Sequence, residues 1–366
     1  MAEKIIKEKL VDMKYIINGR FASRTVTGQE RFCIEIIKEL DNIVKNDGNE
    51  WELVVPEYAD NVPDCKNIKV VRKGKVKGHL WEQTNFAAYV LKNKGLSINM
   101  SMKEPLISPG VVVIHDMAYK LPYSIIKGKG TLKRNVSRIW HRIHHRFAVW
   151  FSPIIFTVSE YSKKQIVEIY HIDPDRVKVL GNGWQHFNSV VPDEGIFEKW
   201  PDLEENEYFF TLGSLKANKN VKWILDVAKK NKNYKFVIAG KASLSDFGVE
   251  YNADTLPNVD IVGYISDGEV KALMSKCKAF IFPSYFEGFG IPPLEAMSVG
   301  ADVIVAKASC LPEIYGDAAH YIDPDNANVD LDKLLEEKTG DKKNILEKYS
   351  WNRFARIMYK DIINIR

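Results

Sequence analysis

Residues 282–297, FPSYFEGFGIPPLEAM, decide the fold of the chain around them. The apolar run at residues 279–282 predicts a buried strand, and Pro292 and Pro293 predict the first turn of a helix. The amides of the glycine-rich turn between them have no helical partner and can donate to hydroxyl or phosphate oxygens. The stretch therefore predicts a ligand-binding turn at the carboxyl end of a strand, bracketed by Glu287 and Glu295.

This stretch resembles the signature of the retaining glycosyltransferases of family 4, the glycosyl transferases group 1, in which seven residues separate two glutamates. The likeness extends to Leu311-Pro312-Glu313 and to Gly-Asp-Ala-Ala at residues 316–319. It implies an α/β fold of the GT-B type: two Rossmann-like, doubly wound parallel-sheet domains that face a central cleft. By the resemblance, Glu287 is catalytic and lies beside the transferred sugar, while Glu295 binds the donor ribose. The resemblance also implies four donor-binding amides: Gly288, Phe289, Gly290 and Ile291.

Length and composition predict two domains. The chain has 366 residues, of which 45% are apolar and 27% charged. A chain of this length is too long for a single compact core. We expect an acceptor-binding domain over residues 1–185 and a donor-binding domain over residues 186–350. As in the resembled family, a last helix over residues 351–366 should pack back on the first domain. The expected strands are residues 15–17, 52–55, 68–71, 111–114, 154–158, 208–212, 236–239, 261–262, 279–282 and 303–305.

Further candidate residues follow other strands, where ligands bind in doubly wound folds. Gly28 opens a helix after the first strand, so its backbone can approach a donor diphosphate; a plain loop glycine is the other interpretation. His115 ends the strand at residues 111–114, where the family keeps an active-site histidine, although a structural histidine is also compatible with this position.

Residues 213–220, GSLKANKN, resemble a family segment that contacts the donor phosphates. Gly213 begins the segment, and Lys219 would neutralise the charge of the leaving nucleotide, a catalytic as well as a binding role. Asn218 stands where the family often has arginine, so a second cationic residue stays open, with Lys216 as one candidate.

The nucleotide is not identified by these residues. In the resembled family the base packs near a short strand that here includes Gly263 and Tyr264, and a plain strand end explains them equally well. UDP, GDP and dTDP therefore all remain open. Because helix-terminus amides and Lys219 can meet the leaving-group charge, we predict no metal site, metal-independent catalysis and no cofactor.

A basic segment offers a hint about the acceptor. Residues 117–159 contain no acid, although the formal net charge of the chain is only +4. Bases interleaved with aromatics are typical of a helix at an anionic lipid surface, and a lipid diphosphate is a compatible acceptor group. A solvated helix with its aromatics in the core is the other open interpretation, and no recognised nucleic-acid module accompanies the segment. The predicted acceptor or membrane contacts are Arg134, Arg138, Trp140 and Arg142.

Cysteine spacing and the start of the chain predict a cytoplasmic setting. The four cysteines have neither metal-ligand nor paired spacing, and no signal peptide opens the sequence. We expect a retaining hexosyltransferase that acts on a glycan or lipid-linked oligosaccharide in cell-surface polysaccharide synthesis, with peripheral contact at the inner membrane face. A noncatalytic nucleotide-sugar-binding protein and a sugar-nucleotide epimerase on the same fold are the alternatives.

Overall fold

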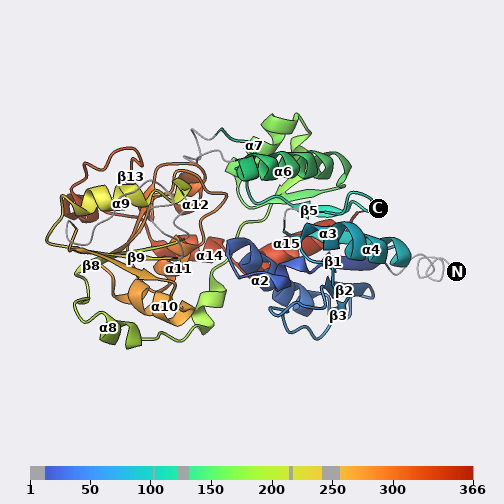
Figure 1. The fold of residues 1–366 in the computed structure, drawn as a ribbon, viewed down its shortest axis with the longest axis horizontal. Coiled ribbons are helices and arrows are strands. Elements are labelled where there is room, and N and C mark those ends of the chain that lie inside the picture. Colours follow the sequence, from blue (N-terminus) through green and yellow to red (C-terminus); the bar gives the residue numbers. More distant parts are fainter. Residues whose placement is uncertain (1–12, 102–103, 123–131, 214–216, 241–255, 366) are drawn as a thin grey trace.

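The computed structural model describes residues 13–101, 104–122, 132–213, 217–240 and 256–365, and for residues 132–134 and 137 it describes the backbone alone. These residues form two α/β units that lie side by side (Figure 1). Each unit is built on one parallel sheet, with the strands of the first at residues 14–179 and those of the second at residues 208–322.

The first sheet has seven parallel strands. Its inner strand β1 is buried on both faces and pairs with β2 on one side and β4 on the other. This pattern is typical of a doubly wound sheet covered by helices. The strands, in order across the sheet, are β3 (Lys69–Arg72), β2 (Glu50–Val55), β1 (Lys14–Asn18), β4 (Leu96–Asn99), β5 (Val111–Val113), β6 (Ile155–Thr157) and β7 (Val177–Val179).

The second sheet has six parallel strands and a core rich in phenylalanine. In order across the sheet they are β10 (Val259–Gly263), β9 (Lys235–Ala239), β8 (Tyr208–Leu212), β11 (Ala279–Phe282), β12 (Val303–Ala306) and β13 (His320–Ile322). The described α-helices are α2 (Gly28–Ile43), α3 (His79–Trp81), α4 (Ala87–Asn93), α6 (Leu132–Phe151), α7 (Glu160–Tyr170), α8 (Gly195–Lys199), α9 (Val221–Ala228), α10 (Asp267–Lys276), α11 (Pro292–Ser298), α12 (Leu311–Tyr315), α13 (Leu331–Glu336), α14 (Lys342–Lys348) and α15 (Trp351–Ile363).

The predicted fold class is confirmed, but three strands were not predicted: β4, β7 and β13. Strand β4 lies between β1 and β5. It was not predicted because polar residues interrupt its apolar pattern. Ser97 and Asn99 are buried in the sheet because they are hydrogen-bonded: Asn18 Nδ2 donates to Asn99 Oδ1 at 3.0 Å, and Ser97 Oγ donates to the Ser108 carbonyl at 3.0 Å. A buried polar strand of this kind lacks the apolar run that identifies a strand in sequence.

The last helix, α15, lies against α2 of the first unit (Figure 1). Asn352 Nδ2 donates to Glu39 Oε2 at 2.6 Å, and the rings of Trp51 and Tyr359 are 6.1 Å apart. The chain therefore crosses from the second unit back to the first.

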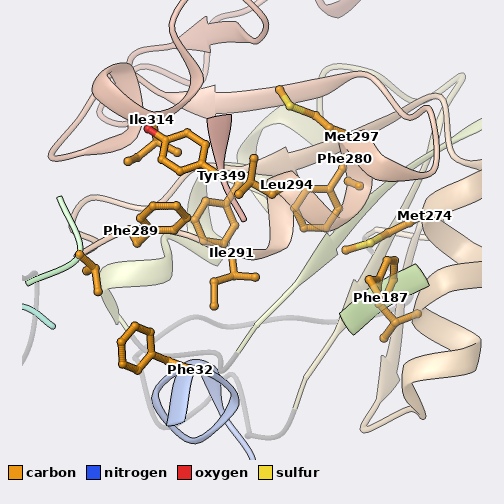
Figure 2. Close-up of a cluster of buried hydrophobic side chains, with 14 of the residues drawn as sticks. Phe32, Phe187, Met274, Phe280, Phe289, Ile291, Leu294, Met297, Ile314 and Tyr349 are labelled. Atoms are coloured by element: carbon orange, nitrogen blue, oxygen red, sulfur yellow. The ribbon is translucent and has the colours of Figure 1, made fainter. Parts of the chain in front are cut away.

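Apolar side chains from both units form one continuous core beneath the junction. Figure 2 shows Phe32 of α2 facing Ile291, which precedes α11, with Phe289 and Tyr349 beyond it. Polar contacts join the units as well: the Glu313 carboxylate accepts hydrogen bonds from the first amides of α7, those of Glu160 and Tyr161, at 2.8 Å each. Among the described residues, no helix is long and apolar enough to cross a membrane.

Candidate active site

The glycine-rich turn joins β11 to α11 and touches the first unit. Gly290 adopts a φ of +88°, which L side chains rarely tolerate. A Cβ atom on Gly288 would lie 2.1 Å from the carbonyl oxygen of His115. Glycine at these two positions therefore lets the turn form and approach the first unit closely.

Carbonyl groups, rather than amides, hold this turn in place. Ser159 Oγ donates to the Gly288 carbonyl at 2.7 Å, Cys310 Sγ donates to that of Phe289 at 3.3 Å, and the Tyr315 hydroxyl donates to that of Gly290. Within the described residues, no acceptor is bonded to the amides of residues 288–291. The four amides are thus available to donate to a ligand.

Lys219 and Glu287 meet at the start of the turn. The Lys219 ammonium nitrogen lies 2.6 Å from Glu287 Oε1, and the side chains are 22% and 13% exposed. The same ammonium lies 4.9 Å from the centre of the Phe282 ring. The Glu287 amide donates to Ser309 Oγ at 3.1 Å, which fixes the backbone of the carboxylate. The structure therefore brings together two of the three predicted catalytic residues as a hydrogen-bonded ion pair.

Glu295 is held by a relay from the last helix. Its Oε1 lies 2.8 Å from Nε2 of His186, and Nδ1 of His186 accepts a hydrogen bond from the Trp351 indole N–H at 3.1 Å. An indole N–H only donates, so Nδ1 has no proton and the imidazole carries it at Nε2, facing the carboxylate. The relay aims one oxygen of Glu295 at His186 and leaves the other for a ligand.

His115 approaches the turn from the first unit. It is buried, its Nε2 lies 2.9 Å from the carbonyl oxygen of Met100, and its ring meets that of Phe32 edge-on at 4.8 Å. Burial lowers the pKa of His115 to about 4, so the imidazole is neutral at physiological pH. Because a carbonyl only accepts, the single proton sits on Nε2 and Nδ1 is a hydrogen-bond acceptor.

This neutral histidine predicts a pH effect on stability. Between the ordinary pKa of 6.5 and the folded value of about 4, the unfolded chain takes up a proton that the folded chain does not. Folding stability is therefore lost as pH falls through that window. From pH 7 to pH 5, the variant His115→Gln should lose about 2 kcal/mol less stability than the wild type, measured by urea unfolding. Burial raises the pKa of Glu104 to about 7, which acts in the opposite direction but equally in both proteins. Equal losses in both proteins would contradict the prediction.

Comparison with known proteins finds a family that part of the chain resembles. Residues 193–352 match the model described as glycosyl transferases group 1. This stretch, somewhat less than half of the chain, is similar to that family. An uncharacterized glycosyltransferase of Methanocaldococcus jannaschii is 26% identical over 258 residues, 64% of this chain and 65% of that protein, so the match spans just under two thirds of that relative. The O-antigen chain mannosyltransferase RfbU of Salmonella typhimurium is 27% identical over 329 residues, 85% of this chain and 87% of that one.

A solved structure agrees on the fold. Anabaena HepE in complex with UDP and glucose superposes with a TM-score of 0.68 at 16% identity, covering 96% of this chain and 100% of that one. The predicted resemblance to the glycosyl transferases group 1 and the predicted GT-B fold are thereby confirmed.

Two other predicted donor residues lie near the same junction. Gly28 is the first residue of α2, and a Cβ atom there would lie 4.0 Å from Ile291 Cδ1, across the boundary between the units. The Gly213 amide donates to the Ala239 carbonyl at 3.1 Å, and Gly213 and Lys219 line one shallow pocket at the carboxyl ends of β8, β9 and β11. Lys216 lies outside the described residues.

Gly263 and Tyr264 lie farther out on the second sheet. Gly263 ends the edge strand β10 with a φ of +72°, and its carbonyl accepts the Gly240 amide at 2.7 Å. The Tyr264 side chain is 77% exposed. Their part in base recognition stays a prediction.

The structure corrects the assignment of the basic residues on α6. Arg138 is buried and donates to the carbonyls of Ala118 and Leu121, and Arg142 donates to the Tyr119 carbonyl at 3.0 Å. These guanidinium groups fasten the loop after β5 to the helix. The buried Arg138 is therefore not part of a membrane-facing surface, whereas the acceptor or membrane role of the half-buried Arg142 stays a prediction. The Arg134 side chain lies outside the described residues, whereas Trp140 is exposed.

Two Asp-Pro-Asp steps have the spacing of a metal-binding pair, and both are used locally. Asp173 caps the short helix Pro174–Arg176, and Asp323 accepts the Asp325 amide at 2.9 Å. In the described part of the chain, no group of three His, Cys, Asp or Glu side chains is placed to hold a metal ion.

Sequence reasoning missed His186 and Trp351 as parts of the site. His186 falls in a Gly-rich stretch that reads as a linker, and its two partners are 109 and 165 residues away. Nothing in the sequence near His186 indicates that it contacts Glu295 or Trp351. Only a prediction of where the last helix packs would have found this relay.

Proposed function

We propose that this chain is a glycosyltransferase that moves a hexosyl residue from a nucleotide sugar to a hydroxyl of a glycan acceptor, with retention of configuration and without a metal ion. The single observation that carries the proposal is the turn at residues 288–291, whose amides lack acceptors among the described residues, beside the Lys219–Glu287 pair. Donors and a cation at one strand end suit a diphosphate and the hydroxyls of its sugar.

Each residue then has a defined task. Lys219 exchanges Glu287 for a donor phosphate and meets the charge that grows on it as the nucleotide leaves. Glu295, aimed by His186, accepts hydrogen bonds from the ribose. Nδ1 of His115 accepts a hydrogen bond from a sugar hydroxyl, and Glu287 stabilises the positive charge at the anomeric carbon.

The chemistry follows a front-face course. The bond from the anomeric carbon to the phosphate oxygen breaks, and a bond from that carbon to the acceptor oxygen forms on the same face. The acceptor proton passes to the departing phosphate oxygen. An α-linked donor therefore gives an α-linked product, and the chain supplies charge stabilisation and positioning.

Mannose is the proposed hexose. The support is the name of the Salmonella relative, an O-antigen chain mannosyltransferase that this chain matches over most of its length. Cell-surface polysaccharide synthesis in the cytoplasm is proposed on the same ground.

A screen of donors tests the proposed function. The protein is heated with UDP-, GDP- and dTDP-hexoses, and one of them should raise the unfolding temperature, since a ligand at a hundred times its Kd stabilises the native state by about 2.7 kcal/mol. The same donor should then lose its nucleotide when a hydroxyl acceptor is added. Binding without nucleotide release would favour a noncatalytic protein, and a free sugar formed with no acceptor dependence would favour an epimerase. Indifference to every donor would refute the proposal.

The exposed face of α6 supports peripheral contact with an anionic membrane. Large apolar side chains on this face are exposed at helical spacing: Val136, Ile139, Trp140, Ile143, Trp150 and Phe151. The Arg146 guanidinium lies 4.4 Å from the Trp150 ring, and residues 117–159 contain no acid. An apolar stripe with basic charge beside it matches a helix lying in the headgroup region. Figure 1 shows α6 at the margin of the first unit.

Membrane binding is expected to depend on this stripe. At low salt the protein should co-sediment with phosphatidylglycerol vesicles and detach as salt screens the contact. Ile143→Glu should weaken binding by about tenfold or more, because it removes an aliphatic side chain that would enter the membrane and adds a negative charge that the anionic lipids repel. Val191→Glu, at a residue that is 79% exposed on the linker, is the matched control. Equal binding to phosphatidylcholine vesicles, or no loss with Ile143→Glu, would contradict the assignment.

A further inference from the structure

The first residue of the last helix is buried between the two units. Trp351 begins α15 and is 2% exposed. On one side its ring meets that of Phe32 on α2 edge-on, with the ring centres 6.0 Å apart. On the other side its indole N–H donates to Nδ1 of His186 at 3.1 Å. One side chain therefore contacts both the first unit and the relay that ends at Glu295 of the second unit.

The two segments of chain that cross between the units are hydrogen-bonded to each other near Trp351. The first crossing runs from β7 to α8, and the second runs from α14 into α15. The indole N–H of Trp184 donates to the Leu346 carbonyl at 2.9 Å. The Gln185 side chain donates to the Tyr349 carbonyl at 2.9 Å and accepts from the Trp351 amide at 3.2 Å. A change of the Trp351 side chain leaves all these bonds between the crossings in place.

The indole of Trp351 fixes the ring of the histidine that faces Glu295. It donates to one ring nitrogen of His186, while the other ring nitrogen lies 2.8 Å from the carboxylate. The side chains of His186 and Glu295 are 4% and 13% exposed, so water competes weakly for these bonds. Without the indole donor the ring loses one of its two fixed points, and the carboxylate that it holds is free to turn.

We propose that Trp351 is a positioning residue for ribose recognition, so that this recognition depends on the contact between the two units. The inference rests on the proposed function, in which Glu295 accepts hydrogen bonds from the ribose. A glutamate side chain has several rotatable bonds, and one that is held before a ligand arrives loses less conformational freedom on binding. Trp351 packs on Phe32 of the first unit, where Figure 1 shows α15 beside α2. The first unit therefore helps to aim a ligand-binding residue of the second.

A substitution that removes the indole N–H tests the assignment in the full chain. Trp351→Phe keeps an aromatic ring at the contact between the units but leaves His186 without its donor. The probes are UDP, GDP and dTDP, each compared with its dideoxy analogue by calorimetry. For a nucleotide that binds, the preference over its analogue should fall by about threefold or more in Trp351→Phe. The affinity for the analogue itself should change little, because no phosphate contact is altered.

Trp184→Phe is the matched control for this test. It removes the same kind of hydrogen bond, from an indole N–H to the Leu346 carbonyl, between the same two crossings. The ribose preference of Trp184→Phe should equal that of the wild type, whereas a purely structural role of the two tryptophans would give both variants the same defect. If Trp351→Phe fails to fold, His186→Leu interrupts the relay at its next member and should lower the preference by a similar factor.

The variant Glu295→Ala separates this proposal from the proposed function. A ribose preference that survives in Glu295→Ala would show that Glu295 does not bind the ribose, and the positioning role would fail with that assignment. A preference that falls in Glu295→Ala but stays at the wild-type value in Trp351→Phe and His186→Leu would overturn the positioning role alone. Adding Trp351→Phe to Glu295→Ala should cause no further loss of preference, since the indole acts through the carboxylate. Equal losses in Trp184→Phe and Trp351→Phe would also overturn the proposal.

Discussion

Replacing Glu287 with glutamine is expected to lower the rate of sugar transfer by about 10²–10³-fold while donor affinity changes little. Glutamine keeps the shape of the side chain but removes the negative charge that we assign to stabilising the anomeric carbon in the transition state. The interaction grows only as that charge develops, so its loss affects turnover more than ground-state binding. The carboxylate is 13% exposed, and this partial burial keeps its field from being fully screened by water.

Single-turnover kinetics and calorimetric donor binding measure the two quantities separately. Glu205→Gln, at an exposed position remote in sequence from the turn, is the matched control and should behave as the wild type does. A Glu287→Gln protein with a wild-type transfer rate would remove the catalytic role given to this residue. A large loss of donor affinity at an unchanged rate would make Glu287 a binding residue instead.

Replacing Lys219 with alanine is expected to raise the Kd of the nucleoside diphosphate by up to about 10²-fold. A hydrogen bond to a charged group contributes about 1.5–3 kcal/mol, and the substitution also leaves Glu287 near the diphosphate without its cation. Lys219→Arg should retain part of the affinity because it keeps the charge.

The comparison of ligands makes this test specific. The wild type should bind a nucleoside diphosphate far more tightly than the nucleoside, and Lys219→Ala should lose most of that difference. In Glu295→Ala the preference for a ribonucleotide over its dideoxy analogue should fall instead, by about tenfold. An undiminished diphosphate preference in Lys219→Ala would show that other residues hold the phosphates.

Local patterns explain which parts of the site could be predicted. The turn with Glu287 and Glu295 lies within sixteen consecutive residues. Its glycines could be recognised in the sequence, and the structure shows why they are needed: Gly290 has a positive φ, and Gly288 lies close to the backbone of the first unit. Lys219 could be placed at a strand end from the segment at residues 213–220. Its ion pair with Glu287 could not be predicted, because the two residues are 68 positions apart in the sequence. The relay from Trp351 through His186 was unpredictable for the same reason.

Helix α6 shows a different limit. Its composition predicted a basic, aromatic helix, but not which face would pack on the protein. The structure buries Arg138 beneath the loop after β5 and exposes Ile143 and Trp150, by 52% and 54%. Long basic side chains can serve as internal hydrogen-bond donors to carbonyls, so their presence alone does not identify the solvent-facing side. Strand β4 was missed similarly, since its buried polar groups are satisfied by partners distant in sequence.

The configuration of the newly formed linkage tests the central proposal most directly. The protein is incubated with an α-linked nucleotide sugar identified by the donor screen and with an accepted methyl glycoside, in the presence and absence of EDTA. Proton NMR then follows the new anomeric centre. We expect an α-linked product at the same rate in both samples. An inverted linkage, or loss of activity on chelation, would contradict the account.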